Sequence, residues 1–248
     1  MNNLLTLHYE INKTNEFIAQ LSTAIKKNIW IEIVSSEKKS TDIPHKLLPK
    51  NPGVIITSSG STGGPNKCLH PFLNLDQSAN ATGEWLIEQN LLPRDCIIFN
   101  PLSMHHIAGL MPWWRSRSWG AEHIFITPET MRNPILLIRK YKEILAQKNY
   151  NLLISLVPTQ LHRLLSHPEG IKFLKAFAII WVGGALLPES IAKAAREKKI
   201  NLAPCYGASE TAAMISALKP KDFLEGQNNC GDLLQDVKIS IDKNNNLK

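Results

Sequence analysis

The stretch from Gly53 to His70 constrains the fold more than any other part of this chain; it reads GVIITSSGSTGGPNKCLH. Four β-forming residues, Val54 to Thr57, lead into a run of Ser, Thr and Gly that closes on Pro65-Asn66-Lys67. Glycines let backbone N–H groups turn toward a ligand, hydroxyls add donors, and Lys67 adds a positive charge. This pattern predicts a buried strand followed by a phosphate-binding loop. A Ser/Gly surface linker is the alternative interpretation.

Two better-known motifs do not fit this stretch. A P-loop NTPase requires G-x-x-x-x-G-K followed by Ser or Thr. Counted from Gly60, the second glycine would fall on Pro65, and Lys67 is followed by Cys68. The loop also lacks G-x-S-x-G, so a nucleophile elbow is unsupported.

The composition indicates an ordinary globular protein. With 248 residues, 44% of them apolar, the chain can form one large α/β domain or two smaller ones. The net charge of +7 comes from scattered Lys and Arg, and few aromatic residues accompany them, so we expect no nucleic-acid partner.

Cysteine spacing and hydropathy bear on the compartment. The four cysteines form no C-x-x-C pair, which argues against zinc ribbons and redox dithiols and favours reduced thiols. The amino terminus does not have the pattern of a signal peptide, and no apolar segment approaches membrane-spanning length. We expect a cytoplasmic protein without membrane insertion.

Hydrophobic periodicity predicts alternating helices and strands, hence an α/β fold with mostly parallel sheets covered by helices. Expected strands are 4–11, 30–34, 54–57, 96–99, 121–127, 152–157, 178–182 and 202–205, and expected helices are 14–28, 74–89, 107–119, 134–147, 159–165 and 188–198. We expect Thr14 to cap the first helix. Ligands of such sheets bind beyond the carboxyl ends of the strands. Four strand ends carry small or polar residues: 58–67, 101–106, 183–185 and 206–211.

Several of these segments together resemble the acyl-adenylate-forming superfamily of acyl-CoA synthetases, luciferases and nonribosomal adenylation domains. The resemblance is carried by SSGSTGGPNK, VPTQLHRLL, VGGALLPES and YGASET, in the order of the family. PLSMHHIAGL followed by WWRSRSWGA is similar to o-succinylbenzoate–CoA ligases of menaquinone and phylloquinone biosynthesis, and the loop ending NKCLH is most like cyanobacterial members. The resemblance implies the large-domain fold of an acyl-CoA synthetase, an acid–thiol ligase, with ATP, Mg²⁺ and coenzyme A as ligands.

The resemblance also implies roles for individual residues. The ATP phosphates would be held by Ser59, Gly60, Ser61, Thr62, Gly63 and Lys67. The adenine and the acyl pocket would be bordered by Gly183, Gly184 and Ala185, while Tyr206, next to Gly207, would stack on adenine. Ser209 would reach the α-phosphate and Glu210 would bind magnesium. His106 would stand beside the reacting carboxylate, and Arg115 would pair with a second carboxylate of the substrate.

The chemistry agrees with these roles. A carboxylate is already ionised near neutral pH, so its attack on the α-phosphate needs alignment and charge neutralisation rather than a strong base. Attack of the coenzyme A thiolate on the acyl adenylate would then release AMP and give the thioester.

Other interpretations stand beside these roles. His105 is not distinguished from His106 by spacing, and Arg115 and Arg117 together fit a solvated helical face. Ser209 followed by Glu210 also fits a helix cap. The three tryptophans of the WWRSRSW segment, Trp113, Trp114 and Trp119, are expected to serve packing.

The sequence departs from the family pattern in two places. Asn66 stands where the family has its loop lysine, and Lys67 stands where glycine is usual. We expect residues 1–52 to be an abbreviated lead and linker, 53–235 the nucleotide- and acyl-binding core, and 236–248 the start of a β region, with no match to a small carboxy-terminal domain.

This leaves three hypotheses: a ligase for o-succinylbenzoate or another aryl or acyl acid, a truncated or inactive binding domain of the same fold, and an unrelated phosphate-binding protein. A homodimer is left open.

Overall fold

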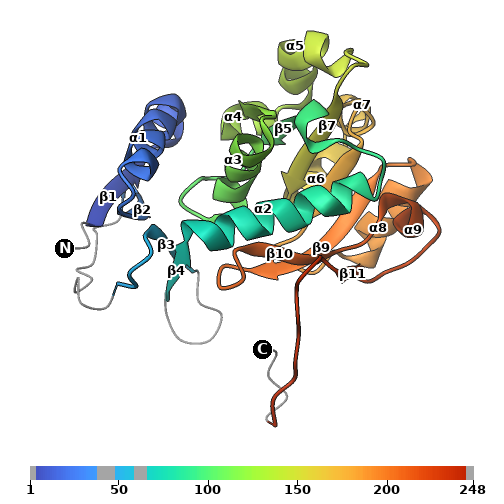
Figure 1. Cartoon of the computed structure of the whole chain (residues 1–248). Coiled ribbons are helices and arrows are strands. Elements are labelled where there is room, and N and C mark those ends of the chain that lie inside the picture. Colours follow the sequence, from blue (N-terminus) through green and yellow to red (C-terminus); the bar gives the residue numbers. More distant parts are fainter. Residues whose placement is uncertain (1–3, 38–47, 59–65, 244–248) are drawn as a thin grey trace.

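The computed structural model describes residues 4–37, 48–58 and 66–243. Its strands form a four-stranded sheet of order β1-β2-β3-β4 and a seven-stranded sheet of order β11-β10-β9-β8-β7-β5-β6, which lie side by side in Figure 1. Strands β1 to β3 are parallel, as are β5 to β9, whereas β4, β10 and β11 join antiparallel. The predicted α/β class with mostly parallel sheets is confirmed.

The smaller sheet consists of β1 (Leu4–Tyr9), β2 (Trp30–Ser35), β3 (Gly53–Thr57) and β4 (Lys67–Pro71). Helix α1 (Thr14–Lys26), preceded by the short 3-10 turn η1 (Ile11–Lys13), crosses from β1 to β2. Its buried residues Phe17 and Leu21 pack with Ile31 and Ile33 of β2. The predicted cap is wrong: Thr14 is the first helical residue, and its hydroxyl donates to the carbonyl of Ile11 instead.

Strand β4 was not predicted, and it changes the place of the glycine-rich loop. Residues 58–66 connect the two arms of a β-hairpin, in which Thr57 pairs with Lys67 and Gly53 with Pro71. A side chain at Gly53 would collide with the carbonyl of His70, so glycine permits the close approach of the two strands.

The larger sheet consists of β5 (Cys96–Asn100), β6 (Glu122–Phe125), β7 (Asn151–Leu156), β8 (Ile179–Val182), β9 (Leu202–Ala208), β10 (Ala213–Ala217) and β11 (Asp232–Leu233). The helices are α2 (Phe72–Ile87), α3 (Ile107–Trp119), α4 (Pro128–Arg132), α5 (Pro134–Leu145), α6 (Pro158–Leu165), α7 (Pro168–Leu174), α8 (Glu189–Glu197) and α9 (Pro220–Leu224), with a 3-10 turn η3 at Pro93–Asp95. Helix α3 has its predicted bounds, whereas α4, α7, α9, β10 and β11 were not predicted. None of the described helices combines the length and apolar character needed to cross a membrane.

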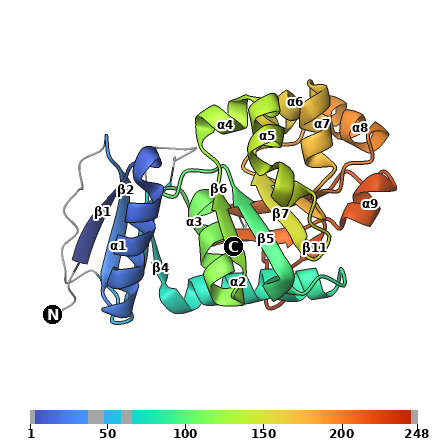
Figure 2. The same cartoon turned by 90° about the horizontal axis from the view of Figure 1, so that it is seen from above.

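Helices cover both faces of the larger sheet, with α2 and α3 on one side and α4 to α8 on the other (Figure 2). Strand β8 is buried on both faces. Ile180 and Val182 belong to the hydrophobic cluster under α5 to α8, and Ile179 and Trp181 belong to the cluster under α2. A strand buried on both faces reads as a continuous apolar run, which is why β8 could be predicted.

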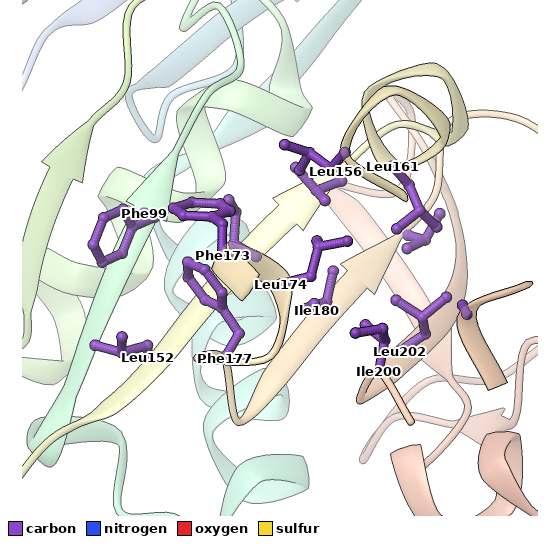
Figure 3. Packing of buried hydrophobic residues seen from close by; sticks show 14 of the residues in the cluster. Phe99, Leu152, Leu156, Leu161, Phe173, Leu174, Phe177, Ile180, Ile200 and Leu202 are labelled. Atoms are coloured by element: carbon purple, nitrogen blue, oxygen red, sulfur yellow. The ribbon is translucent and has the colours of Figure 1, made fainter. Parts of the chain in front are cut away.

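Aromatic rings fill the core under α5 to α8. In Figure 3, Phe99, Phe173 and Phe177 point toward one another between β5 and α7. Phe99 meets Phe177 edge to face with ring centroids 5.3 Å apart, a favoured geometry for aromatic pairs. This packing supports the strands whose carboxyl ends carry the candidate site.

Candidate functional site

Two of the four predicted strand-end segments, 183–185 and 206–211, lie close together, and the strand that follows the segment 58–67 contacts the second of them. Because β8 and β9 run parallel with Val182 opposite Pro204, the Gly183–Ala185 turn lies beside Tyr206. Gly184 adopts a φ of +80°, which favours glycine, and Val157 at the end of β7 lies next to it.

Strand β9 is longer than predicted. We expected it to end at Cys205, but it continues to Ala208, so Tyr206 and Gly207 lie within the strand. The extension is stabilised by β10, where Met214 pairs with Gly207 and Ala213 with Ala208. Tyr206 remains 48% exposed, so its ring is available for stacking.

The hairpin that bears the glycine-rich loop meets the YGASET segment directly. His70 on β4 places Nε2 2.7 Å from the carbonyl oxygen of Ser209. Cys68, two residues earlier, also faces this turn, and the nearby Glu210 carboxylate adds to burial in raising the pKa of its thiol. Strand β4 and the YGASET turn, far apart in sequence, therefore lie in contact.

The segment after β9 is a tight turn that leads into β10 and not the helix cap that its Ser-Glu pair also suggested. The Thr211 hydroxyl accepts from the backbone N–H of Ala208 at 2.9 Å and donates to the carbonyl of Ala213 at 2.7 Å. Ala212 and Ala213 have φ values of 54° and 92°, which are strained for residues with a Cβ. Such strain persists only where surrounding contacts hold it.

Glu210 is exposed on this turn and lines a cavity of about 640 Å³. The cavity lies between α2, β10 and residues 234–237, and His70 and Asp236 also line it. Among the described residues no cluster of three or more His, Cys, Asp or Glu side chains could hold a metal by itself. A single accessible carboxylate still suits Mg²⁺, which keeps several waters and binds through one or two carboxylates and substrate phosphates.

The predicted phosphate-binding residues Ser59 to Gly63 lie outside the described residues, but Lys67 is placed. Its ammonium forms an ion pair with Glu32 of β2 at 2.6 Å, and Glu32 is only 1% exposed. Thr6 of β1 donates a further bond to Glu32 at 3.3 Å. Because side chains alternate along a strand, Lys67 leaves β4 on the face opposite to Cys68 and His70. Its contribution to phosphate binding stays a prediction.

The two adjacent histidines before α3 have different surroundings. His106 is exposed at the N-cap of α3, whereas His105 is partly buried with its ring 5.8 Å from that of Tyr9. Asn100 at the end of β5 supports this segment: its amide donates to the carbonyl of Gly109 at 2.8 Å and accepts from the N–H of Leu102 at 3.1 Å. Of the two histidines, His106 is therefore the more exposed one.

Arg115 does not belong to a solvated helical face. It is 3% exposed, its guanidinium lies over the Trp181 ring at 5.4 Å, and burial lowers its pKa to about 10. Its Nε and Nη2 have no hydrogen-bond partner among the described residues. Arg117, by contrast, is exposed and lies over Trp114. Arg115 is therefore a buried cation with open donors.

The tryptophans of α3 serve packing, as predicted. Trp113 and Trp114 are buried in the core of the smaller sheet, and Trp114 donates to Asp76 of α2 at 2.8 Å. The indole of Trp119 donates to the carbonyl of Ala79 at 3.1 Å. These contacts hold α3 against α2.

Sequence reasoning missed four residues that shape the site: Glu32, His70, Ser78 and Asn100. Each is buried or half-buried and bonds to a partner far away or on another element. The only sequence signal was for His70, since NKCLH alternates in a way that places Cys68 and His70 on one face of an extended segment.

The architecture is that of an acyl-CoA synthetase large domain. It superposes on o-succinylbenzoate coenzyme A synthetase (MenE) from Bacillus subtilis, in complex with ATP and magnesium ion, with a TM-score of 0.65 at 18% identity, covering 99% of this chain and 48% of that one. Residues 7–247 match the family described as AMP-binding enzyme. The chain belongs to this family.

Two curated relatives share the same name. The 2-succinylbenzoate–CoA ligase of Enterococcus faecalis is 29% identical over 75% of this chain and 36% of its own length. The ligase of that name from Oceanobacillus iheyensis is 25% identical over 94% of this chain and 45% of its own length. The chain thus spans less than half the length of these relatives.

Proposed function

We propose that this chain is the nucleotide- and acid-binding part of an acyl-CoA ligase that activates an aromatic carboxylic acid, o-succinylbenzoate, as its acyl adenylate. The observation that carries the proposal is the junction of the glycine-rich hairpin with the YGASET turn, made by the 2.7 Å bond from His70 to Ser209. In this proposal residues 53–235 form the binding core and residues 236–248 begin a further β region.

The nucleotide lies, in this proposal, across the carboxyl ends of β8 and β9. The exposed Tyr206 ring stacks on adenine, and the turn from Gly183 to Ala185 leaves room for the base because its residues have little or no side chain. Ser209 and the loop 59–63 supply donors to the phosphates.

Adenylation joins a carboxylate oxygen of the acid to the α-phosphorus of ATP and breaks the bond to pyrophosphate. Both reactants are anionic, so the protein has to align them and neutralise charge. Glu210 would hold Mg²⁺, which when bound neutralises phosphate charge. His106, exposed at the start of α3, lies beside the reacting carboxylate in this proposal and donates a hydrogen bond to it.

Arg115 supports a dicarboxylic substrate. A buried guanidinium with open Nε and Nη2 donors lacks the counter-charge that a buried cation requires. The second carboxylate of o-succinylbenzoate supplies that charge through a bidentate pair. Attack of the coenzyme A thiolate on the acyl adenylate would follow, giving the thioester used in menaquinone or phylloquinone synthesis.

The test is exchange of labelled pyrophosphate into ATP by this chain, with and without o-succinylbenzoate. The proposal expects exchange that depends on o-succinylbenzoate and is weaker with benzoate, which lacks the second carboxylate. Exchange that is equal with and without the acid contradicts the assigned substrate.

A second candidate is a domain that binds the ligands but turns over poorly. It is favoured by the ion pair of Lys67 with Glu32, which engages the loop cation within the fold. Calorimetry separates the two: binding of ATP and o-succinylbenzoate without exchange supports this candidate, and no binding of any adenine nucleotide rejects both.

A further inference from the structure

We propose that His70 is a positioning residue that fixes the Glu210 turn relative to the phosphate-binding hairpin. This inference rests on the proposed function, because it assigns a purpose to Glu210 as the magnesium-binding carboxylate. It adds a residue of this chain whose side chain acts through the turn and not on the ligands themselves.

The geometry of the His70 contact defines its chemistry. The imidazole is 3% exposed, and its burial lowers its pKa. The carbonyl of Ser209 can only accept a hydrogen bond, so Nε2 carries the proton and donates it at 2.7 Å. The bond therefore fixes one tautomer of His70 and one position of the turn.

The turn needs such support because its backbone is strained at Ala212 and Ala213. The His70 bond holds its beginning at Ser209. Ser78 of α2 holds its end, since the Ser78 hydroxyl donates to the carbonyl of Ala212 at 2.9 Å. Glu210 lies between these two attachments, so the backbone that carries its carboxylate is held on both sides.

Strand β4, which carries His70, also links the loop proposed to bind phosphates with the carboxylate proposed to bind magnesium. β4 starts at Lys67, directly after the loop, and His70 lies three residues further on. One hydrogen bond thus connects the hairpin, which is proposed to hold phosphates, with the carboxylate that is proposed to hold their counter-ion. We infer that His70 sets the distance between them.

Three variants separate the hydrogen bond from packing. His70→Leu keeps an apolar side chain of similar bulk but removes the donor, whereas His70→Gln places an amide N–H at about the reach of Nε2. Ser78→Ala removes the second attachment. His162→Leu on the exposed face of α6 is the matched control.

The first measurement is amide hydrogen exchange of residues 206–213 in the free protein. The inference expects faster exchange there in His70→Leu and Ser78→Ala, near wild-type exchange in His70→Gln, and no change in His162→Leu. Unchanged exchange of residues 206–213 in His70→Leu would overturn the inference. So would exchange in His70→Gln that is as fast as in His70→Leu.

The second measurement is the affinity for ATP with and without Mg²⁺, by calorimetry, with Glu210→Gln as the reference that loses the magnesium-dependent gain. In His70→Leu we expect the ratio of ATP affinity with Mg²⁺ to ATP affinity without Mg²⁺ to fall about tenfold, with the affinity for ATP alone little changed. We expect His70→Gln to restore the ratio. A wild-type gain in His70→Leu would overturn the inference. If the wild-type chain binds no ATP, the proposed function fails. Amide hydrogen exchange of residues 206–213 then still decides whether His70 holds the turn.

Discussion

Glu32 and Lys67 form an ion pair across β3, with Oε1 and Nζ 2.6 Å apart, on the sheet face opposite to His70. Glu32 is 1% exposed, and an isolated charge at such a position would be costly. The displaced lysine of the loop is therefore the counter-ion of a buried carboxylate. This pairing gives Lys67 a role in the fold whatever its role toward phosphates.

We expect Lys67→Met to lower the free energy of unfolding by about 3 kcal/mol, because it removes the ammonium that neutralises the buried Glu32 carboxylate. The double variant Glu32→Gln with Lys67→Met should recover most of that loss, since neither charge remains. Urea unfolding of the two proteins gives the comparison. Lys13→Met, which breaks the exposed pair with Glu10, is the control and should change the stability far less than Lys67→Met does. Equal losses in the single and double variants would contradict this account.

Arg115→Met should separate stability from substrate choice. Removing a buried cation that lacks a counter-ion among the described residues is expected to leave the Tm unchanged or raised. The preference for o-succinylbenzoate over benzoate in pyrophosphate exchange should fall about 10- to 100-fold, as expected for loss of charge-assisted bonds. Arg117→Met, on the exposed side of α3, should keep the preference. An unchanged ratio in Arg115→Met would remove Arg115 from the proposed acid site.

Acid should destabilise the protein partly through His123 on β6. Burial lowers the pKa of His123 to about 4 from 6.5, and the amide of Asn100 lies 3.2 Å from its Nε2. Between pH 6.5 and 4 the unfolded chain binds a proton that the folded chain does not, so stability falls as the pH falls. We expect this histidine to account for about 2 kcal/mol over that window, since the ring is only partly buried.

His123→Gln should therefore flatten the dependence of the unfolding free energy on pH between 6.5 and 4. Unfolding in urea at a series of pH values measures the slope. His162→Gln, on the exposed face of α6, serves as the reference variant. A slope in His123→Gln as steep as that of the wild type would show that other groups govern acid stability.

Local patterns predicted the elements whose signals lie within a few residues. Helix α3 ends where expected because Gly120 follows Trp119 and takes a left-handed φ of 68°. Strand β4 was missed because its stability comes from distant partners: Lys67 turns to Glu32, and His70 turns to Ser209. Neither partner can be found from the letters KCLHP alone.

In the candidate site, too, features set by local sequence could be predicted, and features that depend on distant residues could not. The sequence placed the glycine-rich loop, the Gly183 turn and YGASET at strand ends, and the β8–β9 pairing brings the last two together. The burial of Arg115 could not be predicted, because it depends on Trp181 from a strand far along the chain. The extension of β9 to Ala208 likewise depends on its antiparallel pairing with β10, which follows the turn in the sequence.

Gly207 is the residue through which the length of β9 should affect ligand binding. A Cβ at Gly207 would collide with the backbone carbonyl of Ala213, which has no flexible end to move aside. Gly207→Ala should therefore cost about 1–3 kcal/mol of stability. It should also displace Tyr206, which precedes it, and Ser209, two residues further on, and so weaken AMP binding measured by calorimetry.

Gly120→Ala is the matched control, since Gly120 has a φ of +68° but nothing within 4 Å of an added Cβ. It should cost about 1 kcal/mol through backbone strain and leave AMP affinity unchanged. The contrast isolates the contact between β9 and β10 from the general effect of replacing a glycine. If Gly207→Ala bound AMP as tightly as the wild type, Tyr206 and Ser209 would not depend on the pairing of β9 with β10, and their proposed place in the nucleotide site would have to be abandoned.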